Sequence, residues 1–235
     1  MSKNNTIAVV TVIIVCGLLV AALGIWFGTP TTPKDEVLST NENTLVAPLS
    51  AESLKAYQVS MTNEKNPVAE ITTNHGTFEL ELFEDTMPIT AGNFIKLATE
   101  GFYDGVQFHR VIDGFMIQGG DPITKTDQVF KYGTGGSGQT IPDEFIEGQY
   151  LTNVRGTISM ANSGPNSGSS QFFINVADNV NLDFDKPPFT SKHPVFGRVL
   201  SGMEVVDEIS MVETNERDLP MESVLIESIK IRRAE

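Results

Sequence analysis

The sequence predicts a mostly β domain, a barrel or a sandwich, carried behind an N-terminal transmembrane helix. From residue 67 to the end, short β-rich runs recur, glycine-rich turns separate them, and only two segments have helical spacing. A continuous apolar run, 7–27, precedes this region. Many short strands with few helices favour a barrel or sandwich over a doubly wound parallel sheet.

Composition limits the functions that the chain can have. Its 235 residues are 40% hydrophobic and include 14 Phe, which is enough apolar material for a packed core. The single cysteine, Cys16, excludes a disulfide framework and a cysteine-based metal site. Residues 67–235 carry 12 basic and 25 acidic side chains, hence −13 of the formal net charge of −14. We therefore expect no nucleic-acid partner.

The apolar run predicts a membrane anchor at 7–27, behind a short tail at 1–6. No charged residue lies between Lys3 and Lys34, and at about 1.5 Å per residue the run spans roughly 31 Å, the thickness of a bilayer core. Because acidic residues follow Lys34 at once, the charge bias places the N-terminus in the cytoplasm and the domain outside the cell membrane.

The N-terminal region also contains a candidate cleavage site and a linker. Ala22-Leu-Gly24 offers small residues for cleavage, so the alternative is a protein secreted after signal cleavage near Gly24, although the apolar run is longer than that of a usual signal. Residues 28–66 are rich in Thr, Ser, Asn, Glu and Pro and predict a flexible linker, with one short helix at 50–58.

The domain at 67–235 opens with a predicted hairpin. Val68 to Thr73 and Thr77 to Phe83 are strands on either side of an Asn-His-Gly turn. In the second strand every other residue is apolar, and Glu79 and Glu81 lie on the opposite face. This alternation is typical of a half-buried strand.

The remaining elements follow in order. Pro88, apolar residues at helical spacing and Gly101 just beyond the last of them predict an amphipathic helix. A second, shorter helix is predicted at Met203 to Ile209. The other predicted strands are 107–112, 156–160, 171–176, 195–200 and 224–231.

Several kinds of catalytic or cofactor site are disfavoured. The glycines of 133–138 match a dinucleotide-binding pattern, but no amphipathic helix follows, so a surface loop is predicted there. His75, His109 and His193 lie far from one another and from carboxylates at ligand spacing, which argues against a metal. No Gly-x-Ser-x-Gly elbow is present. We expect no cofactor and no covalent chemistry.

Two unusual segments remain, Phe108-His-Arg-Val-Ile-Asp-Gly-Phe-Met-Ile-Gln-Gly-Gly-Asp121 and Gly156-Thr-Ile-Ser-Met-Ala-Asn-Ser-Gly-Pro-Asn-Ser-Gly-Ser-Ser-Gln-Phe-Phe-Ile174. With them, the chain resembles a cyclophilin, a peptidyl-prolyl cis-trans isomerase, from about residue 67 to 233. The resemblance implies a closed eight-stranded antiparallel barrel, capped by two α-helices, with the site on the outer barrel face.

The same resemblance assigns roles to individual residues. The implied catalytic residues are Arg110, Phe115 and Gln118, with the arginine bound to the prolyl carbonyl. Phe115 also belongs to the implied proline pocket. The implied substrate-binding residues are Met116, Phe173 and Leu182 in that pocket, Ala161, Asn162 and Gln171 along the groove, and His193 at its far side. Rotation about an X-Pro bond breaks no bond, so no metal is required.

Some residues of these segments have a structural interpretation instead. Phe108, Met160, Phe172 and Ile174 are predicted to face the barrel interior, because they fit strand alternation. His109 is predicted to be a structural histidine with satisfied hydrogen bonds.

The chain departs from the family pattern at two places. Asn181 stands where many members have tryptophan, and ten residues, 183–192, replace about three between the pocket leucine and the histidine. Catalysis should survive both changes, whereas cyclosporin binding should be weak.

The sequence therefore predicts a membrane-tethered prolyl isomerase that assists the folding of extracytoplasmic proteins. Its expected partners are proline-containing polypeptides and, through 7–27, the lipid bilayer. The alternative is a prolyl-peptide binding module or chaperone with little turnover, and the complete pocket with its arginine favours the enzyme.

Overall fold

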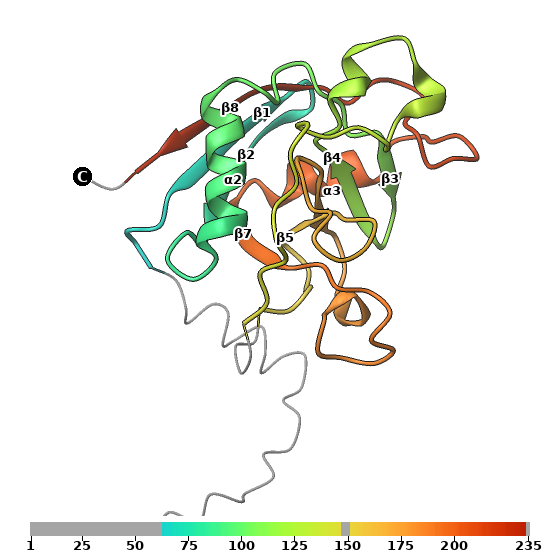
Figure 1. The fold of residues 1–235 in the computed structure, drawn as a ribbon. Helices are drawn as coiled ribbons and strands as arrows, with labels where there is room; N and C mark the ends of the chain where they lie inside the picture. The colour runs from blue at the N-terminus through green and yellow to red at the C-terminus, as the bar shows by residue number, and fades with distance from the viewer. Residues whose placement is uncertain (1–62, 147–150, 234–235) are drawn as a thin grey trace, which may run out of the picture. The chain divides into compact units, whose positions relative to one another are not determined.

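Figure 1 shows the computed structural model of the chain, which describes residues 63–146 and 151–233. The predicted anchor at 7–27, the tail before it and the helix predicted at 50–58 lie outside the described residues. No helix within the described part of the chain is long and apolar enough to cross a bilayer.

The described residues form one antiparallel sheet of eight strands, in the order β3-β4-β6-β5-β7-β2-β1-β8. The predicted mostly β fold with two α-helices is thus confirmed. The strands are β1 Val68–Thr73, β2 Gly76–Leu82, β3 Arg110–Ile112, β4 Met116–Gly119, β5 Thr157–Met160, β6 Phe172–Asn175, β7 Val195–Ser201 and β8 Ile226–Arg232. The helices are α2 Pro88–Thr99 and α3 Met203–Ser210, with 3-10 turns η1 Pro122–Lys125, η2 Val129–Lys131 and η3 Val180–Leu182.

The predicted closure of the barrel is wrong, because the end strands β3 and β8 share no ladder. The segments just before them meet in a single bridge, Gln107 opposite Leu225. Three backbone hydrogen bonds join the same segments, from Gly105 N to Ile226 O at 2.8 Å, from Ile226 N to Val106 O at 2.8 Å and from Phe108 N to Val224 O at 2.9 Å. Because residues 105–108 bond outside the ladder, β3 begins at residue 110 rather than at the predicted 107.

The two helices pack on different strands of the sheet, α2 on β7 and β8 and α3 on β2, β3 and β4 (Figure 1). Phe94 of α2 lies at the centre of the core, with its ring 5.1 Å from Tyr103 and 5.4 Å from Phe172 between centroids. The four residues predicted to face the interior all belong to this core and are at most 1% exposed, which confirms that prediction: Phe108, Met160, Phe172 and Ile174.

Alternation missed β4 for a physical reason. Met116 and Ile117 are consecutive residues and both are buried, at 2% and 0% exposure, because Met116 packs in a small apolar cluster on one face of β4 and Ile117 in the main core on the other. In a strand of four residues, this leaves no alternation of apolar and polar side chains to mark it.

Glu81 of β2 lies on the face predicted for it but is only 2% exposed. Its carboxylate accepts hydrogen bonds from Asn63 N and Asn66 Nδ2, both at 3.1 Å, and pairs with Arg198 Nε at 3.0 Å. The last residues of the predicted linker, 63–66, therefore pack against the sheet.

Candidate active site

The register of three neighbouring strands places the main site residues in one row. Arg110 of β3 lies opposite Gln118 of β4, which lies opposite Phe173 of β6. Directly opposed residues of antiparallel strands share a face of the sheet. The alternate row contains Ile117 and Ile174, which belong to the core, so the row of Arg110 lies on the outer face.

A cavity of about 520 Å³ opens on this outer face. It brings together nine of the ten predicted site residues: Arg110, Phe115, Met116, Gln118, Ala161, Asn162, Phe173, Leu182 and His193. The tenth, Gln171, lines an adjoining cavity of about 630 Å³, whose lining also includes Gln118, Ala161 and Asn162. No group of three or more metal-ligating side chains occurs within residues 63–146 and 151–233.

The floor of the first cavity is apolar. Met116, Phe173 and Leu182 form a buried cluster separate from the main core, with Phe115 packed against it. The ring of His193 stands edge-on to Phe173 at 5.4 Å between centroids, and its Nδ1 lies 3.1 Å from the carbonyl oxygen of residue 160. Burial lowers the pKa of His193, so the ring is neutral at neutral pH. The floor thus offers an uncharged slot for an apolar ring.

A chain of amides joins the two cavities. Gln118 Nε2 donates to Gln171 Oε1 at 2.9 Å, and Gln171 Nε2 donates to the carbonyl oxygens of Gly133 at 3.0 Å and Gly135 at 2.8 Å. The carboxylate of buried Asp121 accepts from the backbone N–H groups of the same two glycines. A Cβ at Gly135 would lie 2.1 Å from that carboxylate, so glycine is required there. The segment predicted as a loop is a loop, and it lines the second cavity.

Within the described part of the chain, Arg110 has one side-chain partner. Its Nε lies 3.4 Å from Oδ2 of Asp218, in a turn before β8, and both side chains are 43% exposed. The backbone of Asp218 has a left-handed φ of +59°, and its carbonyl accepts a hydrogen bond from Val111 N at 2.8 Å. Among the described residues the two Nη atoms of Arg110 have no hydrogen-bond partner, so their donors remain available at the cavity.

The sequence interpretation missed the residues that complete this side of the cavity. Val129, Tyr132, Arg217 and Leu219 also line it, and Asp218 holds its arginine. They come from η2, which lies between the two signature segments, and from the turn before β8, which follows both. The polar run Asn-Glu-Arg-Asp at 215–218 is a turn signal, but nothing in it indicates which strand it approaches.

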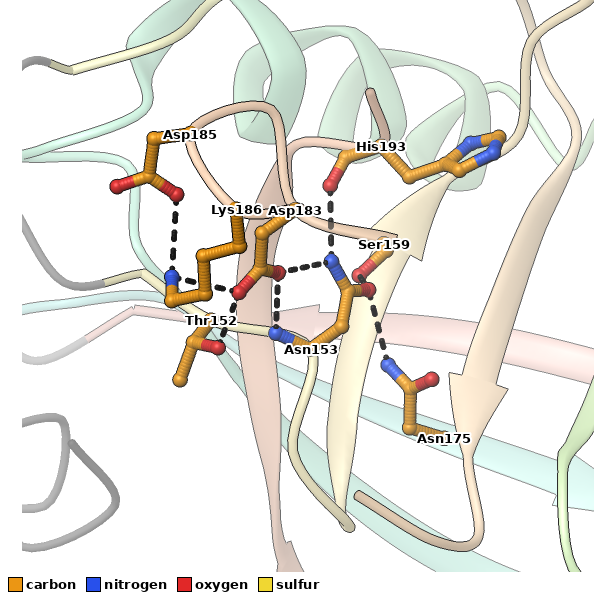
Figure 2. A network of polar contacts seen from close by, with 8 residues as sticks. All are labelled: Thr152, Asn153, Ser159, Asn175, Asp183, Asp185, Lys186 and His193. Atoms are coloured by element: carbon orange, nitrogen blue, oxygen red, sulfur yellow. Dashed lines mark hydrogen bonds and ion pairs between the residues drawn. The ribbon is translucent and has the colours of Figure 1, made fainter. Parts of the chain in front are cut away.

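The wall formed by Leu182 and His193 keeps its place despite the ten residues between them. His193 N donates to Leu182 O at 3.0 Å, which closes the loop 183–192 at its base. Figure 2 shows how Asn153 spans the same gap: its Nδ2 donates to Asp183 Oδ1 at 2.7 Å and to His193 O at 3.1 Å. Its Oδ1 accepts from Ser159 Oγ at 2.7 Å, so the buried amide bonds with both its nitrogen and its oxygen.

Asp183 anchors the loop from inside the protein. It is 2% exposed, and its carboxylate accepts from Thr152 Oγ1 and from Asn153 N, and pairs with Lys186 Nζ at 2.7 Å (Figure 2). Burial lowers the pKa of Lys186, but the hydrogen bonds and charges of Asp183 and Asp185 outweigh that effect and raise it above its ordinary value. The added loop therefore carries its own charge pair.

The prediction that His109 has satisfied hydrogen bonds is wrong. The residue is 5% exposed, and neither ring nitrogen has a hydrogen-bond partner among the described residues. The ring helps to line the first cavity and lies next to the glycine loop, with Nε2 3.5 Å from the position of a Cβ at Gly133. Burial lowers the pKa of His109, although the charge of Asp121 and the nearby backbone of Gln107 oppose this.

The protein should become less stable as the pH is lowered, because of this ring. A pKa lowered on folding means that the unfolded chain binds the proton more tightly. The free energy of unfolding therefore decreases as the pH drops below about 6.5. Changing His109→Leu removes two unpartnered nitrogens and should leave stability at pH 8 unchanged or higher, and flatten the decline below pH 6.5. Urea unfolding at several pH values measures both effects. An unchanged slope in the variant would contradict this account.

Comparison with known proteins gives a consistent family. The family model "Cyclophilin type peptidyl-prolyl cis-trans isomerase/CLD" matches residues 68–231. A peptidyl-prolyl cis-trans isomerase-like 1 of Emericella nidulans is 40% identical over 166 residues, 69% of this chain and 93% of the relative. A putative bifunctional phosphatase/peptidyl-prolyl cis-trans isomerase of Streptococcus pyogenes is 39% identical over 205 residues, and the chain covers only 41% of its length.

Solved structures agree with these relatives. The crystal structure of a Cryptosporidium parvum cyclophilin type peptidyl-prolyl cis-trans isomerase has a TM-score of 0.61 and 30% identity, and the match covers 72% of this chain and 99% of that one. A second structure of the same protein, determined in the presence of the dipeptide Ala-Pro, has a TM-score of 0.60.

Proposed function

Because this chain belongs to the cyclophilin-type peptidyl-prolyl cis-trans isomerases, we propose that it accelerates X-Pro rotation in extracytoplasmic proteins from a membrane-anchored position, and so assists their folding. The observation that carries the proposed site is a single cavity with Arg110 beside the apolar cluster of Met116, Phe173 and Leu182. We assign Arg110, Phe115 and Gln118 to catalysis and the other cavity residues to substrate binding.

The geometry suits a reaction that needs only selective binding. Twisting an X-Pro amide costs about 18 to 20 kcal/mol because resonance is lost. The apolar cluster holds the pyrrolidine ring, while the free Nη donors of Arg110 bind the prolyl carbonyl more strongly when the amide is twisted. About 7 kcal/mol of such preference would accelerate rotation by roughly 10⁵. Gln118, oriented by its hydrogen bond to Gln171, supports the same network.

The folding role is tested with a substrate whose refolding is limited by X-Pro isomerisation. The full-length chain in detergent should accelerate the slow, tens-of-seconds phase of an exported protein with a native cis proline. A variant of that substrate without the cis proline is the control, because its refolding should be unaffected. Equal refolding rates with and without the enzyme would contradict a role in folding.

The proposed anchor rests on the uncharged run 7–27. The full-length protein should remain in membranes after carbonate extraction, whereas a variant without residues 1–33 should not. A C-terminal tag should be cleaved by protease added outside intact cells. A mature N-terminus at about residue 25 would replace the anchor by a cleaved signal, and a protected tag would reverse the proposed orientation.

Weak cyclosporin binding is proposed from Asn181. This residue is exposed in η3 and does not line the first cavity, beside which a family tryptophan is expected. An indole offers an apolar face and one N–H donor, so Asn181→Trp should tighten cyclosporin binding by roughly 30- to 1000-fold, equivalent to about 2 to 4 kcal/mol, with peptide isomerisation nearly unchanged. Calorimetric titration measures the affinity. Nanomolar binding by the unmodified protein would contradict the assignment of position 181.

A further inference from the structure

We propose that Arg217 makes this isomerase prefer substrates with a carboxylate side chain close to the proline, an inference that rests on the proposed function of the cavity. Arg110 and Arg217 line that cavity, and none of the residues that line it is acidic. The domain as a whole carries −13 from residue 67 onward. The site is therefore a local exception to an acidic surface.

The two arginines differ in their ion-pair partners. Arg110 is paired on its Nε side with Asp218. Arg217 is exposed and forms no ion pair with any residue in 63–146 or 151–233, and this includes Glu213 and Glu216 of its own turn. Of the two arginines that line the cavity, Arg217 is therefore the one whose charge no ion pair offsets among the described residues.

The turn that carries Arg217 is held in place. Asn215 Oδ1 accepts from Arg217 N at 2.8 Å and from Leu219 N at 3.3 Å, while Asn215 O accepts from Asp218 N at 2.9 Å. The turn is docked on β3 through the hydrogen bond from Val111 N to Asp218 O. Its backbone therefore stays beside the proposed catalytic arginine.

An extended peptide in the cavity brings its own charges within reach of this guanidinium. Two residues on either side of a proline span about 7 Å, less than the Debye length of about 10 Å at 0.1 M salt. A glutamate in that range gains attraction to Arg217, and a lysine is repelled. Because the pair is exposed, the gain is modest, about two- to fivefold in kcat/KM.

The test compares peptides that differ only in charge. Glu, Gln and Lys are placed in turn at the two positions before and the two after proline, in peptides with blocked termini, and kcat/KM is measured with the full-length chain in non-ionic detergent. At one or more positions we expect Glu to exceed Gln and Gln to exceed Lys. High salt should shrink the Glu/Gln ratio.

In the Arg217→Gln variant, the Glu and Gln peptides should have equal kcat/KM. The matched control is Lys230→Gln, which removes the same charge from β8, where Lys230 pairs with Glu70 at 3.6 Å. This control should keep the ratio. Equal rates for Glu and Gln peptides at every position, or a preference that survives Arg217→Gln, would overturn the inference. Failure to isomerise any peptide would instead overturn the proposed function.

Discussion

Replacing Arg110 with alanine should lower kcat/KM by about 100-fold or more while the protein stays folded. Arg110 lines the cavity with no partner on its Nη donors among the described residues, and a charged donor that prefers the twisted amide is worth about 3 kcal/mol or more. Because its side chain is 43% exposed and its ion pair with Asp218 is long, removal should cost less than about 1 kcal/mol of stability. Isomerisation assays and urea unfolding on the same preparation measure both.

Two companion variants sharpen this test. Arg110→Lys keeps a positive charge but loses the planar fork of donors, so it should recover only part of the lost rate. Lys230→Ala removes an exposed cation remote from the cavity and should retain full activity. Near-normal turnover in a folded Arg110→Ala protein would remove this residue from the mechanism.

The second large effect is expected on stability. Asp183→Ala should lower the unfolding free energy by about 3 kcal/mol, because it removes the buried carboxylate that Lys186, Thr152 and Asn153 share. The same change should reduce activity, since Asp183 adjoins Leu182 of the pocket wall. Urea unfolding monitored by circular dichroism measures the stability.

The matched control lies two residues away on the same loop. Asp185 also pairs with Lys186, at 3.1 Å, but is 39% exposed at its side chain, so Asp185→Ala should cost less than about 1 kcal/mol. If the two variants were equally stable, the buried network around Asp183 would not be what holds the loop.

Much of the fold could be predicted because its signals are local. The hairpin β1–β2 follows from alternation over neighbouring residues, and α2 follows from helical spacing between a proline and a glycine. Seven of the nine predicted site residues at the first cavity lie in the signature segments, and Leu182 and His193 follow them. β4 could not be predicted from alternation, since Met116 and Ile117 bury an apolar side chain on each face of a four-residue strand.

What sequence patterns could not supply are contacts between distant segments. Arg110 and Asp218 are separated by 108 positions, and Asn153 and Asp183 by 30. Such pairs depend on strand register and on how loops close, and neither leaves a periodic trace in the residues themselves. The lack of a ladder between β3 and β8 and the unpartnered ring of His109 likewise depend on how distant segments meet, so sequence patterns could not predict them.

The sequence alone was therefore enough to indicate the β-rich class, the uncharged N-terminal run and the residues of a prolyl isomerase. Each of these depends on residues that lie close together in the sequence. The tertiary structure decided which face of the sheet carries Arg110, how a ten-residue loop leaves Leu182 and His193 adjacent, and that Arg217 reaches the same cavity. These depend on the long-range packing of side chains, where a one-residue shift in register would move every side chain to the other face.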